Sequence, residues 1–159
     1  MNSKLTIPAE LVRTLRIGLH SELGEAASEI DVISYQPGRE EYPEWYEEPL
    51  AQLDGARDLL DVTGWGETRQ RVEVEVDLTE HHVALFGALR GQVLIHRDMI
   101  EEADQVDADR AEQGKPPKAQ ATIARAAALD RLLASAEAQA EALGIDTGQP
   151  DDEVQDSDS

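Results

Sequence analysis

The most regular feature of the chain is a row of seven mostly apolar positions on one predicted helix face. They follow one another at alternating steps of four and three residues: His82, Phe86, Leu89, Val93, His96, Ile100 and Ala103. A mean step of about 3.5 residues keeps such a row on one face of an α-helix over about six turns. Because an apolar helix face must be covered by another element, the pattern predicts a helical bundle.

Similar rows predict three further helices. The first begins near Pro8 and runs for about 24 residues. The second starts within residues 43–49 and ends at Gly64, and Pro49 must lie in its first turn because proline has no N–H to donate. The last covers about residues 117–143 and is rich in alanine, which allows two helix axes to approach closely. We expect the second helix to bury one row of side chains: Leu50, Leu53, Ala56, Leu60 and Thr63.

One segment does not follow the helical period. At residues 71–78, apolar side chains alternate with acidic ones, which is typical of a half-buried strand. The nearest comparable run is Asp31–Tyr35, and residues 1–6 read as a short polar lead. Three arrangements stay open: the segment lies extended across the bundle, pairs with a short partner, or pairs with its copy in a second chain. The next helix is expected to begin near Asp77, whose side chain is a good N-cap.

Taken together, these patterns predict an all-α protein. We expect a four-helix bundle with one extended or strand-like segment at about 71–78. The length of 159 residues suits a single helical-bundle domain, which we assign to residues 1–143. Residues 144–159 are acidic and almost without apolar side chains, so we predict a disordered acidic tail there.

The net charge of the chain restricts the classes of partner that it can bind. The formal net charge is −20, and each quarter of the chain is acidic. Such a surface repels nucleic-acid phosphates and anionic membranes, and it suits a basic protein partner. The longest apolar stretch, residues 83–89, is far shorter than the roughly 20 residues needed to span a bilayer. With no apolar run of signal-peptide length and no Cys, a cytoplasmic location is expected.

Motifs of common enzyme classes are missing from the sequence. The lack of Cys excludes a thiol nucleophile and any site with a Cys ligand. No G-x-S-x-G motif marks a catalytic serine, and no glycine loop of the phosphate-binding type follows a strand. These absences favour a protein that is not an enzyme and that needs no cofactor.

The histidines offer the one alternative chemistry, a divalent-metal site. His20, His82 and His96 lie on or beside predicted buried faces, and Glu22 borders the face of the first helix. His82 and His96 are 14 residues apart, about 21 Å along a helix, so they cannot bind the same ion. Neither a Glu-x-x-His nor a His-x-x-x-His spacing is present. The competing interpretation is that each buried histidine bonds to a backbone carbonyl or a facing carboxylate.

We therefore expect a small acidic protein that acts by protein–protein interaction or regulation and self-associates through a helical seam. The alternative is a metal-binding bundle protein or enzyme with a His/carboxylate site between helices. A third hypothesis presents the acidic stretch at residues 101–112 to a basic protein. Tyr42, Trp45 and Tyr46 cluster before the second helix, either as an exposed contact patch or as side chains that fasten a loop to the bundle.

Overall fold

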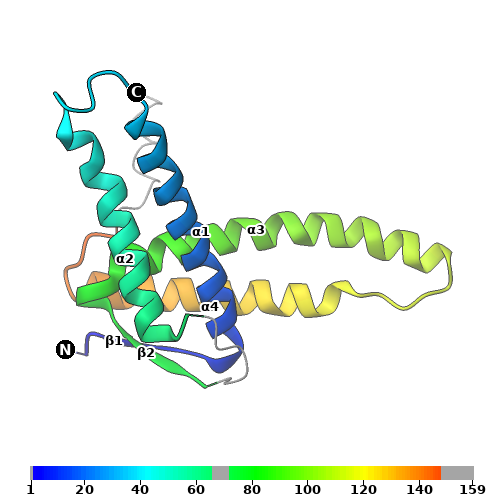
Figure 1. Cartoon of the computed structure of the whole chain (residues 1–159). Coiled ribbons are helices and arrows are strands. Elements are labelled where there is room, and N and C mark those ends of the chain that lie inside the picture. The colour runs from blue at the N-terminus through cyan, green and yellow to red at the C-terminus, as the bar shows by residue number, and fades with distance from the viewer. Residues whose placement is uncertain (1, 66–71, 148–159) are drawn as a thin grey trace, which may run out of the picture.

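The computed structural model describes residues 2–65 and 72–147 of the chain. It confirms the all-α fold with four long helices, accompanied by a short 3-10 helix and a small two-stranded sheet (Figure 1). In chain order the elements are β1 (Lys4–Ile7), α1 (Ala9–Ser34), η1 (Pro43–Tyr46), α2 (Glu47–Thr63), β2 (Val74–Asp77), α3 (Leu78–Glu112) and α4 (Ala119–Ala142).

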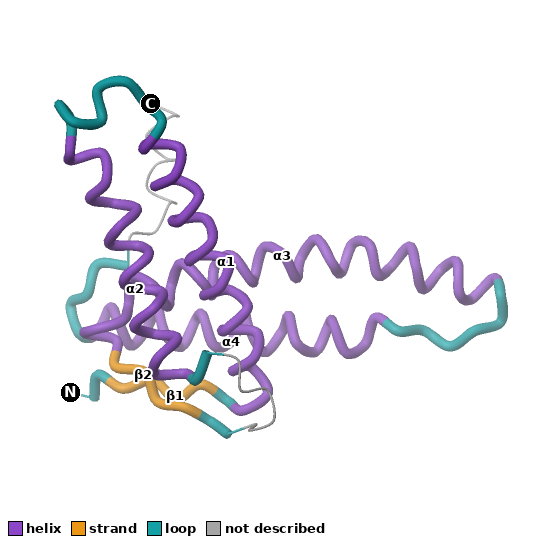
Figure 2. Tube along the Cα trace, in the orientation of Figure 1, coloured by secondary structure: helices purple, strands orange, loops and turns teal. Residues whose placement is uncertain are grey.

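The four helices form two antiparallel hairpins that cross each other (Figures 1 and 2). Helix α1 packs along α2, and α3 packs along α4. The α1–α2 hairpin lies across the first half of α3, and α1 and α2 both contact that helix. Beyond the crossing, the far end of each hairpin projects away from the other, and we call these ends the α1–α2 arm and the α3–α4 arm.

The helix boundaries follow from the local sequence as predicted. The carboxylate of Asp77 accepts a hydrogen bond from the Thr79 N–H at 2.9 Å and caps the start of α3. Pro49 is the third residue of α2, where its missing N–H costs no hydrogen bond. Gly64 ends α2 with a left-handed φ of 88°, a conformation that glycine adopts without strain.

The strand-like segment pairs with a short partner, one of the three predicted arrangements. β1 and β2 run antiparallel, with Lys4 opposite Asp77 and Ile7 opposite Val74. The partner lies within the segment that was interpreted as a polar lead, so that interpretation was wrong for Lys4–Ile7. The other comparable run, Asp31–Tyr35, forms no strand, because Asp31–Ser34 completes α1. β1 has four residues, which is too short for alternation to be distinguished from chance.

The core lies where the two hairpins cross. Its largest fully buried side chains come from β1 and from all four helices: Phe86, Ile7, Leu11, Leu15, Leu19, Leu59, Leu60, Leu78, Leu85, Leu89, Leu129 and Val12. Ile145, in the segment predicted to be a disordered tail, packs against this core. The rest of that predicted tail, residues 148–159, lies outside the described residues.

Candidate functional site

Each histidine of the candidate metal site donates to a backbone carbonyl, in three separate places. His20 is exposed on α1, and its Nε2 lies 2.9 Å from the Trp65 carbonyl oxygen. The Nδ1 of His82 lies 3.0 Å from the Leu78 carbonyl oxygen one turn earlier on α3. In His96, Nδ1 makes the same kind of bond, at 2.8 Å, to the carbonyl of the residue four positions before it.

Glu22, the carboxylate of the predicted metal set, binds a side chain of α2. Its Oε2 accepts a hydrogen bond from the Gln52 Nε2 at 2.6 Å. Burial, followed by repulsion from Glu25, raises the pKa of Glu22, although the bond from Gln52 lowers it. Within residues 2–65 and 72–147, no three His, Cys, Asp or Glu side chains gather closely enough to hold a metal ion.

His96 is the most buried of these groups and is incompletely bonded. The residue is 4% exposed on α3, and its Nε2 is buried without a hydrogen-bond partner. An unpaired buried nitrogen costs about 1–3 kcal/mol of folding free energy. The predicted position of His96 on a buried helix face is thus confirmed. The unpaired Nε2 lowers the stability of the folded protein.

A cavity of about 310 Å³ opens where α1, α2 and α3 meet. Glu22 and Gln52 line it together with Glu80, His81 and Gly87. The cavity has room only for glycine at position 87, because a Cβ there would lie 2.6 Å from the Glu22 Oε1 and would displace the carboxylate. No pattern in the sequence indicated this cavity, because its lining comes from three helices that the spacing patterns cannot align with one another.

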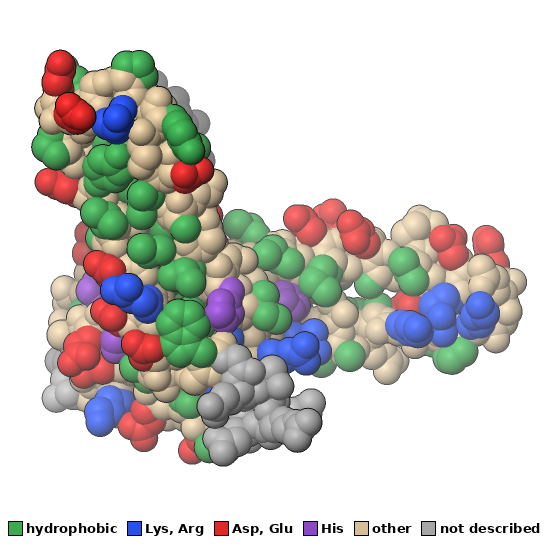
Figure 3. Space-filling model, in the orientation of Figure 1, with side chains coloured by type: hydrophobic (Ala, Val, Ile, Leu, Met, Phe, Trp, Pro, Cys, Tyr) green, Lys and Arg blue, Asp and Glu red, His purple; other side chains and the backbone are tan. Residues whose placement is uncertain are grey.

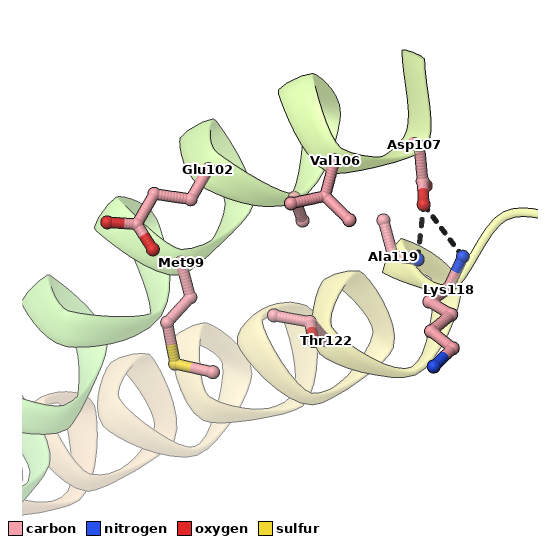
Figure 4. Close-up of a pocket in the computed structure, with 8 residues that line it drawn as sticks. Met99, Glu102, Val106, Asp107, Lys118, Ala119 and Thr122 are labelled. Atoms are coloured by element: carbon pink, nitrogen blue, oxygen red, sulfur yellow. Dashed lines mark hydrogen bonds between the residues drawn. The ribbon is translucent and has the colours of Figure 1, made fainter. Parts of the chain in front are cut away.

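A second hollow lies on the α3–α4 arm, between the two helices (Figure 4). Its volume is about 240 Å³, and Met99 and Val106 of α3 face Thr122 of α4 across it. At its end, the Asp107 carboxylate accepts hydrogen bonds from the backbone N–H groups of Lys118, at 2.7 Å, and Ala119, at 3.1 Å. Asp107 therefore caps α4 from the neighbouring helix and closes the hairpin.

Met99 and Val106, which line the hollow, also belong to a longer apolar row on α3, and the second half of that row is partly exposed. Ala84 and Ala88 form the first part of the row, and they lie against Gly55 of α2 and Gly18 of α1. The row continues along the same side of α3 at helical steps beyond the crossing. Its exposed part, which we call the arm face, consists of Ile95, Met99 and Val106, with 46%, 38% and 49% of their surface accessible.

Figure 3 shows the charge around this part of the molecule. Acidic side chains follow the α3 edge of the arm, basic side chains follow the α4 edge, and hydrophobic side chains lie between them (Figure 3). Residues 97–112 carry seven acidic and two basic side chains, whereas residues 115–131 carry four basic and one acidic. The arm is therefore more mixed in charge than the uniformly acidic surface that the net charge alone suggests.

The aromatic cluster before α2 lies at the end of the α1–α2 arm and serves partly to close the loop. The rings of Tyr42 and Trp45 are stacked with centroids 4.9 Å apart, and both would contact a Cβ at Gly38. The Tyr46 hydroxyl lies 3.3 Å from the Ser34 Oγ at the end of α1. These contacts fasten the loop, as one of the two interpretations predicted, yet η1 has no buried residue.

Two further observations bear on the class of protein. Among the described residues, no helix is both long enough and apolar enough to cross a membrane. In comparisons with known proteins, no protein family, curated protein or solved structure matches the chain.

Proposed function

We propose that this chain acts by protein–protein interaction rather than catalysis, and that it forms a homo-oligomer through the arm face. The cytoplasmic location expected from the sequence is part of the same proposal. The observation that supports it is the apolar row of α3, which α1 and α2 cover over its first half and which continues through Ile95, Met99 and Val106 with 38–49% of each side chain exposed.

The arm face is made of side chains that gain free energy when covered. Fully burying one such side chain contributes about 1.5–3 kcal/mol, so covering the exposed half of each yields about 1 kcal/mol. Three such side chains on each of two copies give roughly 6 kcal/mol before the cost of association. This supports a weak, reversible contact rather than a permanent one.

A second copy is the partner that we assign to this face. It carries the same partly exposed apolar row, and a two-fold contact lets one patch on each copy cover the other. The net charge of −20 opposes the contact, because two acidic molecules repel each other over the screening length of the solution. Self-association should therefore strengthen as salt concentration rises.

Sedimentation velocity over a wide concentration range tests the proposal. The wild type should sediment as a mixture of monomer and dimer, and Met99→Glu should remain monomeric because a charge would be buried in the contact. Val83→Glu is the matched control, since it adds the same charge to α3 at a 73% exposed side chain away from the arm face. Equal loss of dimer in both variants, or a wild type that is monomeric throughout, would refute the assignment.

A further inference from the structure

The aromatic side chains of this protein are concentrated at one end of the molecule. The whole chain has one Phe, two Trp and three Tyr, and all three Tyr and one Trp fall within residues 35–46. That segment joins α1 to α2 at the end of the α1–α2 arm, away from the crossing of the hairpins (Figure 1). We use the name aromatic tip for Tyr35, Tyr42 and Trp45.

The rings of the aromatic tip remain in contact with solvent. Tyr35 is 80% exposed, Tyr42 46% and Trp45 37%. The stack of Tyr42 on Trp45 occupies one face of each ring and holds the pair in a defined position. Aromatic side chains that are rigid and exposed in this way are the residue types most enriched among the energetic centres of protein–protein contacts.

The charge around the aromatic tip has one sign. Residues 40–48 contain five glutamates and no basic residue: Glu40, Glu41, Glu44, Glu47 and Glu48. All five are exposed, so their carboxylates are available to an approaching partner. Arg39 is the single basic residue between positions 35 and 48. Exposed ring faces attract cations through their quadrupole, and the surrounding carboxylates add to that attraction.

We propose that the aromatic tip binds a basic polypeptide segment, with Arg or Lys side chains lying on the rings and against the flanking glutamates. This inference rests on the proposed function and names a partner class for a second surface of the same protein. A nucleic acid would be repelled by the five carboxylates, although its bases stack on aromatic rings. A purely apolar segment would bury the rings but would leave the carboxylates unpaired.

The probe for this site is a fluorescein-labelled peptide of alternating Arg and Gly, compared with a Glu/Gly peptide of equal length. The protein carries Trp65→Phe, so that Trp45 is the remaining Trp and reports binding at the tip by its own fluorescence. We expect saturable binding of the basic peptide, a change in Trp45 emission and no binding of the acidic peptide. Affinity should fall steeply as salt concentration rises.

Matched charge reversals separate the tip from the general acidity of the chain. Glu41→Lys with Glu44→Lys changes the net charge by the same amount as Glu101→Lys with Glu112→Lys, on the other arm. The tip pair should weaken peptide binding by about tenfold or more, and the other pair by about twofold or less. Tyr35→Ala should weaken binding by about fivefold, because this ring is largely exposed in the free protein.

Equal weakening by the two charge reversals, or no effect of Tyr35→Ala, would overturn the inference and leave a nonspecific attraction. Failure of the aromatic tip is distinguishable from failure of the proposed function, because self-association is measured separately. A protein that dimerises but does not distinguish the peptides refutes the tip alone. A protein that binds the basic peptide at the tip but stays monomeric refutes the arm face.

Discussion

The crossing of the two hairpins depends on one glycine, and replacing it tests the fold at its centre. A Cβ at Gly18 of α1 would lie 2.8 Å from the Ala88 carbonyl oxygen and 3.0 Å from the Ala88 Cβ of α3. Both atoms belong to Ala88, which is 1% exposed, and they cannot move aside as the far end of a flexible side chain would. The Gln92 Cγ, at 3.1 Å, adds to the crowding. We therefore expect Gly18→Ala to push α1 away from α3.

The expected magnitude is a balance of two terms. Alanine in a helix interior is favoured over glycine by about 1 kcal/mol. Extra volume in a well-packed contact costs about 1–3 kcal/mol, and here the upper part of that range applies because the closest atom is backbone. Gly18→Ala should therefore lower the free energy of unfolding by about 1–2 kcal/mol.

Gly24→Ala provides the control on the same helix. No atom beyond the helix backbone lies within 4 Å of a Cβ at Gly24, so this variant should gain the full helix preference and become more stable by about 1 kcal/mol. Urea unfolding followed by far-UV circular dichroism measures both changes. If Gly18→Ala stabilises the protein as much as Gly24→Ala does, the close approach of α1 and α3 is not real.

Three more variants test individual parts of the structure by the same unfolding assay. Burial raises the pKa of Glu22, so the ionised carboxylate lowers the stability of the folded state. Glu22→Gln should therefore raise the free energy of unfolding near neutral pH. This gain should vanish below the ordinary glutamate pKa of about 4.3, where the carboxyl group is protonated in both the folded and the unfolded state. A gain that is independent of pH would contradict this reasoning. His96→Leu should raise stability by about 1–2 kcal/mol, because it removes the buried Nε2 that has no partner; a loss of stability would show that the nitrogen is satisfied in solution. Asp107→Ala should lower stability by about 1 kcal/mol through loss of the cap on α4, and Asp107→Asn should retain most of it.

The helices were predictable because each carries its own signal. The row from Phe86 to His96 is buried as its spacing indicated, and the Asp77 and Gly64 caps lie where the sequence placed them. The row of α2 was only partly right, because Leu50 is 44% exposed and Leu59, outside the row, is fully buried. Leu50 lies in the part of α2 that projects beyond the crossing, and spacing within one helix does not say where its cover ends.

The relations between elements were not predictable in the same way. Gly18 meets Ala88 across 70 positions of sequence, and neither residue differs locally from other small residues in helices. The partner of β2 is a four-residue strand with no pattern of its own. The aromatic cluster was visible in the sequence, but its contacts with Ser34 and Gly38 and the exposure of its rings could be learned only from the structure.

Met99 permits the most direct test of the arm face, because the chain contains one other methionine, Met1. In protein labelled with ¹³C at the methionine methyl groups, the Met99 signal reports on that face alone. We predict that this signal shifts or broadens as protein concentration rises, more strongly at high salt, and that Val83→Glu leaves the change intact. A Met99 signal that stays constant over the whole accessible concentration range would contradict it.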